Sequence, residues 1–481
     1  MSLRLTALRS VRWTAASTAS NLVARFLITL FAAHLLAPAD IGLYALVNLV
    51  LGFAYLFADA GVSQAIIAKQ AASPEQLSSL YWFNILFGLA IALLFGLAAP
   101  VISGLYGQPR LLGMLLLAAV NFAVAPVAQS FQALLQKELR FNALARVDLG
   151  ANLLGGAAAA AMLAGGIGIY ALVLAQLLTA TTRSLLLWLV GRDLLQVRMR
   201  LRYGEIRGFV HFGLYQVGDR AVNYINTRLD QLLIAALLGP QILGYYNMAW
   251  LLVVEPVYRI NPIITAVAFP VFARKQDDPS ALRRGFLVVV KLLATTNAPL
   301  LLGCAAAAPS FVPLLLGEQW RPAIPLIEMC SIIAIARTIN NPVGSLVLAV
   351  GRADKSFYWS LAQAAVQLPL YALGLATLGL IPATWLLCAI NIVAVPLVYF
   401  WLIRPILGPI ARDYALAVLP PITIALGMAL LVRAIAVSSG TAGFAALALQ
   451  VAAGAAIYGG LSLIFRRDDV VQLAGLIRAR A

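Results

Sequence analysis

The sequence predicts an all-α polytopic membrane protein of about 14 transmembrane helices, arranged as two six-helix lobes with two extra C-terminal helices. Of its 481 residues, 62% are hydrophobic and only 11% are charged, a balance that a soluble core of this size does not require. Apolar runs of about 20 residues or more, each long enough to cross a hydrocarbon layer of about 30 Å, follow one another along the chain. A ten-residue pattern also occurs twice.

Short breaks rich in Gly, Pro and charge separate the apolar runs and mark the ends of the expected helices. None of these connections is long enough to hold a soluble domain. The expected helices span residues 13–36, 41–68, 77–103, 110–136, 143–164, 167–192, 209–238, 241–273, 284–308, 322–349, 355–378, 381–405, 412–433 and 441–465.

The net charge of +16 is unevenly distributed along the chain. With the amino terminus on the cytoplasmic side, most Lys and Arg residues fall in cytoplasmic segments, which is the positive-inside asymmetry. The charge therefore indicates topology and attraction to anionic lipid headgroups rather than nucleic-acid binding. Both termini are expected in the cytoplasm. The basic clusters occupy residues 4–12, 137–146, 192–207, 274–284 and 466–480.

Nothing in the sequence favours a metal centre or an enzyme. The three cysteines lie in apolar runs without a CxxC spacing or a nearby histidine, so we expect them to pack in the core. No Walker lysine motif, no HExxH motif and no acidic pair occurs at membrane depth. We therefore expect no cofactor. Any energy source would be the membrane potential or a coupled H⁺ or Na⁺.

An internal repeat divides the chain. The pattern LLAPADIGLY (35–44) matches LLGPQILGYY (237–246) and places Pro38 over Pro240, a shift of 202 positions. Six helices separate the two copies, so both copies have the same orientation. This predicts a parallel repeat about an axis along the membrane normal, with substrate sites between the halves. The predicted parts are residues 1–205, residues 206–405, and residues 406–481 with two additional helices and a basic cytoplasmic tail.

A polar stripe runs through the seventh expected helix, in the stretch DRAVNYINTRLD (219–230). Successive helical residues turn by 100°, so five polar positions share one side and Arg220 stands at its margin. A charge at the centre of a membrane helix costs from about 2.5 to well over 10 kcal/mol, depending on the scale. We therefore expect the stripe to line a substrate path. Its members are Asp219, Asn223, Asn226, Thr227 and Asp230.

Three other expected helices carry polar residues at membrane depth. Arginines suit a diphosphate, because the planar guanidinium binds phosphate oxygens in a fork. Amide and aromatic side chains suit sugar hydroxyls and ring faces, although aromatic residues also serve helix packing. Besides the stripe, the candidate cavity residues are Asn21, Arg25, Arg259, Arg337 and Asn340.

The acidic residues at membrane depth leave two interpretations open. Glu255 and Arg259 are four residues apart, so they can form an ion pair that only neutralises itself. Asp59 is expected either to pair with Arg25 or to bind a coupling cation. Asp219 and Asp230 are coupling candidates as well, unless they neutralise Arg220.

Seven segments together resemble the Wzx-type polysaccharide exporters, most closely the colanic-acid exporter branch of the multidrug/oligosaccharidyl-lipid/polysaccharide transporter superfamily. The resemblance extends from the first helix to about residue 410. Within it, NYINT carries Asn223, Asn226 and Thr227, and NPIIT carries Asn261. The segments are YWFN (81–84), FQALLQKELRF (131–141), NYINT (223–227), GYYNMA (244–249), NPIIT with FPVFARKQDD (261–278), FVPLLLGEQW (311–320) and NPVGSLVLAVGRAD (341–354).

The resemblance implies a flippase in the bacterial inner membrane that moves an undecaprenyl-diphosphate-linked oligosaccharide repeat unit to the periplasmic leaflet, for exopolysaccharide or lipopolysaccharide synthesis. It also implies two six-helix lobes around a central cavity. The expected partners are the lipid-linked oligosaccharide, the bilayer and the polymerase or co-polymerase machinery. Two alternatives are a drug/cation antiporter of the same superfamily and a membrane glycan polymerase or ligase. The second needs a sizeable outer loop, which this chain lacks.

Overall fold

The computed structural model describes residue 24 and residues 26–58, 73–138, 140–195, 201–276, 278–439 and 443–465. Throughout these ranges the regular elements are helices and no strand occurs, which confirms the predicted fold class. The described residues include 12 helices long and apolar enough to span a membrane. The chain divides into two compact units, Met1–Gly244 (unit 1) and Tyr245–Ala481 (unit 2). The predicted boundary between the lobes at residue 205 stays a prediction.

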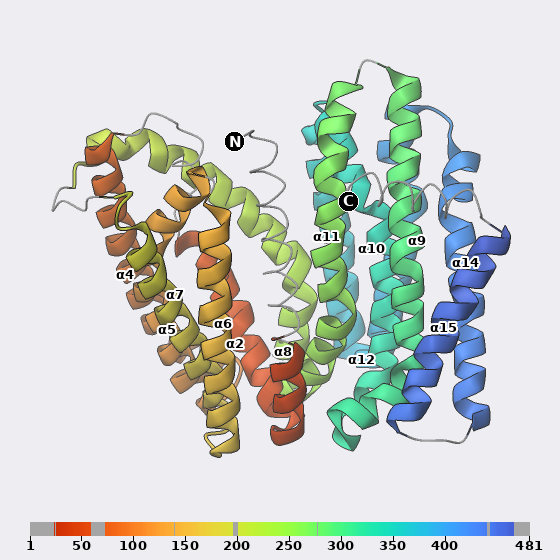
Figure 1. Cartoon of the computed structure of the whole chain (residues 1–481), viewed down its shortest axis with the longest axis horizontal. Coiled ribbons are helices and arrows are strands. Elements are labelled where there is room, and N and C mark those ends of the chain that lie inside the picture. The colour runs from red at the N-terminus through yellow and green to blue at the C-terminus, as the bar shows by residue number, and fades with distance from the viewer. Residues whose placement is uncertain are drawn as a thin grey trace. The chain divides into compact units, whose positions relative to one another are not determined.

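Within the described residues, unit 1 contains a short apolar helix, five long helices and the first part of α8 (Figure 1). Local sequence explains where the helices begin. Ser73 caps α4 through a reciprocal pair of hydrogen bonds with Gln76, and Pro109 opens α5. The elements are Phe26–Leu35, α2 (Pro38–Ala58), α4 (Pro74–Leu105), α5 (Pro109–Lys137), α6 (Phe141–Ala164), α7 (Tyr170–Gly191) and α8 (Tyr203–Arg274).

Unit 2 continues from the end of α8 with long helices and three short irregular turns of helix (Figure 1). Two ion pairs fasten α14 to other helices of unit 2. Arg283 at the start of α9 pairs with Asp413 on α14 at 2.5 Å, and Arg433 of α14 pairs with Glu328 on α10 at 2.5 Å. The elements are α9 (Pro279–Phe311), η1 (Val312–Leu316), η2 (Glu318–Ala323), α10 (Ile324–Ala349), α11 (Ala353–Leu378), α12 (Leu380–Val398), η3 (Tyr399–Ile403), α13 (Arg404–Leu407), α14 (Ala411–Ser439) and α15 (Phe444–Phe465).

The predicted break between the seventh and eighth helices, at residues 239–240, is confirmed but is shorter in the structure. Two helices meet across a kink inside α8, where Gly239 departs from helical geometry with φ 82° and ψ 178°. That backbone conformation favours glycine, because a side chain would clash there. The basic connection predicted at residues 193–208 is also shorter, because α8 already begins at Tyr203.

The two units share one order of helix packing. In unit 1, α4 packs on α5, α5 on α7 and α7 on α6; in unit 2, α9 packs on α10, α10 on α12 and α12 on α11. These are the helices that the predicted repeat makes equivalent. The shared order supports the repeat.

A reciprocal contact joins α2 to the turn in α8, inside unit 1. A Cβ atom on Gly42 would overlap the carbonyl oxygen of Pro240, and a Cβ atom on Gly244 would overlap that of Pro38. The repeat shift of 202 positions relates Pro38 to Pro240 and Gly42 to Gly244. The two backbones therefore meet where neither helix carries a side chain, as small residues allow in membrane helices.

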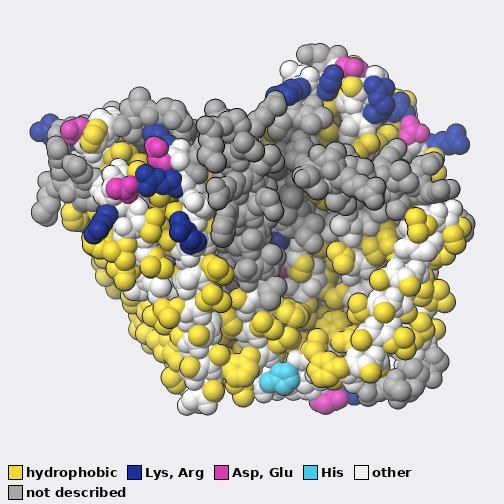
Figure 2. Space-filling model, viewed as in Figure 1, with side chains coloured by type: hydrophobic (Ala, Val, Ile, Leu, Met, Phe, Trp, Pro, Cys, Tyr) yellow, Lys and Arg dark blue, Asp and Glu magenta, His cyan; other side chains and the backbone are white. Residues whose placement is uncertain are grey.

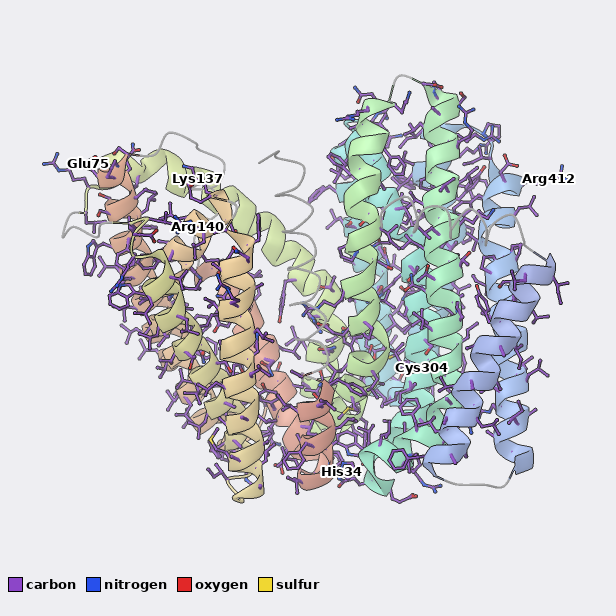
Figure 3. The ribbon with its side chains drawn as sticks, viewed as in Figure 1. His34, Glu75, Lys137, Arg140, Cys304 and Arg412 are labelled. Atoms are coloured by element: carbon purple, nitrogen blue, oxygen red, sulfur yellow. The ribbon has the colours of Figure 1, made fainter. Side chains whose placement is uncertain are left out.

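The surface of each unit matches a membrane environment. Figure 2 shows hydrophobic side chains along the sides of the helices, with Lys and Arg side chains gathered mainly toward one end. On α4, Leu93, Leu94 and Leu97 are 65%, 66% and 67% exposed, which lipid tails accommodate without cost. Figure 3 places Lys137 and Arg140 at one end of unit 1 and His34 at the other end.

The first turn of α9 offers a test that depends on pH. The Asp278 carboxylate accepts hydrogen bonds from the Ala281 backbone N–H, the Ser280 hydroxyl and the Ser280 backbone N–H. Together these hydrogen bonds hold the pKa of Asp278 below its usual value. Its stabilisation is therefore present above the unfolded pKa of about 3.9 and is lost as pH falls through the lower folded pKa. We expect Asp278→Ala to lower the Tm in detergent at pH 7, and by less below pH about 4.

Asp278→Asn is the matched control, because asparagine also caps a helix but does not titrate. Its Tm should stay near that of the wild type at pH 7. An Asp278→Ala deficit of the same size at every pH would contradict the carboxylate's role.

Candidate functional site

Arg337 is the best-defined candidate, and it lies in the middle of α10. Its Nε donates to Asn391 Oδ1 of α12 at 3.4 Å, and its Nη1 donates to the Tyr258 hydroxyl of α8 at 3.2 Å. Its guanidinium carbon stands 5.2 Å from the ring centroid of Trp250, also on α8, within the range of a cation–π contact. Three neutral groups from two neighbouring helices thus fix a cation at membrane depth.

The groups around Arg337 are themselves held in place. The Asn391 side-chain amide donates to the Leu387 carbonyl at 2.9 Å, which turns its oxygen toward Arg337. The Trp250 and Tyr258 rings lie 6.2 Å apart, and Trp250 is only 2% exposed. A guanidinium that is held this firmly loses little freedom when an anion binds to it.

Glu255 and Arg259 form the ion pair that their spacing allows. Arg259 Nη2 stands 3.0 Å from Glu255 Oε1, and its Nε donates to the same oxygen at 3.3 Å. The arginine side chain is 45% exposed and the glutamate side chain 16%. The pair leaves Arg259 accessible. A role of Arg259 in binding substrate and a role of Glu255 in coupling to a cation stay predictions.

Asn261 lies in a polar contact between three helices of unit 2. It accepts from the Asn297 side-chain amide of α9 at 3.0 Å and donates to the Thr338 hydroxyl of α10 at 3.5 Å. Asn261, Asn297 and Thr338 are 2%, 1% and 2% exposed. Asn261 therefore holds α8 to its neighbours, and a contact of its side chain with substrate stays a prediction.

Asn340 follows Arg337 by three residues on α10 and is half-buried. Its side-chain oxygen is buried and has no hydrogen-bond partner among the described residues, as is also true of the next residue, Asn341. A buried amide oxygen without a partner costs free energy. These two amides are acceptors that a ligand hydroxyl would satisfy.

The polar stripe of α8 is described only at its end. Thr227 Oγ1 donates to the Tyr224 carbonyl at 3.1 Å. Asp230 is 4% exposed, and one of its oxygens accepts from the Gln231 backbone N–H at 2.9 Å. The side chains of Asp219, Arg220, Asn223 and Asn226, and the whole of Asn21, Arg25 and Asp59, lie outside what the structure describes, so their predicted roles remain predictions.

Unit 1 contains an ionic contact that the sequence reasoning missed. Arg183 Nε of α7 stands 2.7 Å from Asp148 Oδ1 of α6, and Arg183 Nη2 donates to Gln132 Oε1 of α5 at 3.1 Å. The two charged side chains are 31% and 30% exposed. The sequence signal for this contact was a pair of opposite charges, Asp148 and Arg183, inside two consecutive apolar runs.

Within the described ranges, no group of three or more His, Cys, Asp or Glu residues is arranged to hold a metal ion. The three cysteines are free thiols, and two of them are buried.

Comparison with known proteins assigns the chain to a family. Residues 31–325 match the family described as "Polysaccharide biosynthesis protein". The chain belongs to this family. The match covers more than half of the chain and includes the helices from α2 to α9.

Two curated relatives agree with the family over most of their lengths. The teichuronic acid biosynthesis protein TuaB of Bacillus subtilis (strain 168) is 33% identical over 413 residues, which are 84% of each chain. The lipopolysaccharide biosynthesis protein WzxC of Escherichia coli (strain K12) is 30% identical over 426 residues, covering 89% of this chain and 87% of the relative. The predicted resemblance to Wzx-type exporters is confirmed.

A solved structure shows the same fold. The structure described as "Lipid II flippase MurJ, inward closed conformation" aligns with a TM-score of 0.72 over 96% of this chain and 100% of its own, at 13% identity. With the family, the relatives and the apolar helices, it identifies the chain as a multi-pass membrane protein of polysaccharide biosynthesis.

The Arg183 contact predicts a measurable change in stability. Arg183→Ala leaves the Asp148 carboxylate without its ion pair inside unit 1, and because the pair is partly exposed, solvent reduces the penalty. We expect a loss of about 1–3 kcal/mol, measured by denaturant unfolding in detergent micelles.

Asp148→Asn in the Arg183→Ala background removes the stranded charge. The double variant should therefore be more stable than Arg183→Ala alone. Equal stability of the two variants would mean that the unpaired Asp148 carboxylate carries no penalty.

Proposed function

We propose that this protein moves a polyprenyl-diphosphate-linked oligosaccharide from the cytoplasmic to the outer leaflet of the bacterial inner membrane by alternating access. The observation that carries the proposal is the fixed guanidinium of Arg337 in the middle of a membrane-spanning helix. A charge at that depth is costly unless it faces the bundle interior or a watery cavity. Membership of a polysaccharide biosynthesis family supplies the class of substrate.

The chemistry of the headgroup fits this arginine. Bare phosphate charge cannot cross hydrocarbon at a useful rate, because the desolvation of an ion costs tens of kcal/mol in the idealised limit. A planar guanidinium offers parallel N–H donors to two phosphate oxygens. The unsatisfied amide oxygens of Asn340 and Asn341 are on the same helix, where sugar hydroxyls would be acceptable donors.

The remaining parts of the proposal rest on the sequence. Arg25 and Arg220 would share the diphosphate with Arg337, while the polyprenyl tail stays in lipid. Energy would come from the membrane potential or from a cation bound at Asp59 or Asp230. Both termini would lie in the cytoplasm, as the distribution of basic residues indicates.

The proposal predicts a strong effect of Arg337 in a strain whose own copy of the gene is deleted. Arg337→Ala should lower polymer export at least tenfold, because the diphosphate loses its fixed partner, and the lipid-linked intermediate should accumulate in the cytoplasmic leaflet. Arg337→Lys keeps the charge but loses the fork, so its export should be intermediate. Surface polymer, leaflet-resolved lipid-linked oligosaccharide and membrane protein level are measured together.

Arg433→Ala is the matched control, since Arg433 is half-exposed and pairs with Glu328 near the end of α14. Its export should match the wild type. Unimpaired export by Arg337→Ala at a normal protein level would contradict the role of Arg337 in binding the diphosphate. Normal polymer in the deletion strain, together with new sensitivity to cationic dyes, would favour the drug/cation antiporter instead.

A further inference from the structure

Tyr224 of α8 makes a hydrogen bond to the main chain of another helix. Its hydroxyl donates to the Leu49 carbonyl of α2 at 2.9 Å, in the middle of that helix. A helical carbonyl has a second lone pair, so Leu49 can accept this bond and keep its own helical bond. The Tyr224 ring also lies 6.3 Å from the ring of Phe53, one turn further along α2.

Gly52 makes room for this contact. A Cβ atom at Gly52 would overlap the Tyr224 hydroxyl oxygen and would stand 2.9 Å from Cζ, the ring atom that carries it. Any other residue at position 52 would therefore push the ring away from the Leu49 carbonyl. The absent side chain forms a notch on α2 that fits the end of one tyrosine.

Among the described residues, the notch is one of two fixed points between α2 and α8. The other is the reciprocal contact at the start of α2, where Gly42 meets Pro240 and Gly244 meets Pro38, just past the kink at Gly239. The reciprocal contact holds the end of residues 203–238, the part of α8 before the kink, against α2, and the Tyr224 bond attaches the same part at a second point. One residue of helical register equals 100° of rotation, so a tyrosine held in the notch sets the direction of every side of residues 203–238.

We propose that Tyr224 and Gly52 are positioning residues that fix the rotation of α8 and thereby turn its polar stripe toward the substrate path. By helical spacing, the stripe is centred about a third of a turn around the helix from Tyr224. Thr227, a member of the stripe, is tied to the same turn by its bond to the Tyr224 carbonyl. The proposal rests on the proposed function only where it treats the stripe as the substrate path.

The test measures the direction of the stripe through thiol labelling. In full-length protein with Cys304, Cys330 and Cys388 replaced by Ala, single cysteines are placed on the stripe and on the opposite side of α8. A water-soluble methanethiosulfonate reagent should label the stripe positions faster. The stripe positions are 223, 226 and 227, and the opposite positions are 221 and 225.

Two variants change the contact in different ways. Gly52→Ala displaces the tyrosine ring, so the ratio of stripe to opposite labelling should fall at least threefold and polymer export about tenfold. Tyr224→Phe keeps the ring in the notch and removes only the hydroxyl bond, so both values should fall about twofold to threefold. Gly96→Ala is the matched control, because its new Cβ would meet only Leu116, at 3.9 Å.

Combining the two substitutions separates positioning from general packing. Phenylalanine lacks the oxygen that overlaps a Cβ atom at position 52 and leaves only ring carbons, at 2.9 and 3.1 Å, so Gly52→Ala with Tyr224→Phe should recover part of the way from Gly52→Ala toward Tyr224→Phe. A double variant no better than Gly52→Ala would overturn the proposal. If Gly52→Ala fails to accumulate in the membrane, Tyr224→Phe decides, and an unchanged labelling ratio there overturns the proposal as well.

The labelling result does not depend on the identity of the substrate. A shifted ratio together with normal polymer in the deletion strain would leave the positioning role intact and remove the proposed function. An unchanged labelling ratio together with lost polymer in the deletion strain would remove the positioning role and leave the proposed function intact.

Discussion

A polar group at membrane depth needs a partner in the protein, in a ligand or in a watery cavity, because hydrocarbon offers none. The main chain meets this constraint by forming helices throughout the described residues. Side chains meet it in small groups that join two or three helices, such as Arg183 with Asp148 and Asn261 with Asn297. The same polar contacts that satisfy the chemistry of the membrane therefore also fix which helices are neighbours.

Arg337 meets the same constraint in a different way. Its contacts with the Tyr258 hydroxyl, the Asn391 amide and the face of Trp250 each stabilise a cation without cancelling its charge. Arg183 instead has a carboxylate at 2.7 Å. Both arginines lie in apolar helices and are held there by groups from neighbouring helices.

The sequence was sufficient to predict the helices, because apolar length and the breaks at Gly and Pro are local properties. It also anticipated the Glu255 and Arg259 pair, whose spacing within one helix is visible in the sequence. It did not anticipate the Arg183 contact, because that joins α5, α6 and α7 and depends on how they pack. The break expected between the seventh and eighth helices is confined to Gly239, because proline at position 240 is acceptable in the first turn of a new helix.

The family resemblance was informative about the fold for a reason that became visible only in the structure. Tyr81 packs against Phe131 with ring centroids 5.8 Å apart, and Trp320 is fully buried against Tyr245. These residues belong to four of the segments that carried the resemblance, and they hold helices together. Segments of this kind identify an architecture, whereas the residues that choose a glycan must be sought on the polar faces.

The reciprocal contact of Gly42 and Gly244 with the opposite prolines has a consequence for the history of the chain. When residue i of one copy meets residue j of the other, and j meets i, the contact has the form of a two-fold homodimer interface. A half-length ancestor carrying one proline and one glycine at these positions would present the surface needed to pair with its own copy. Fusion of two such genes would preserve the crossing, and later divergence of the copies would be constrained at these four residues while the polar faces remained free to change.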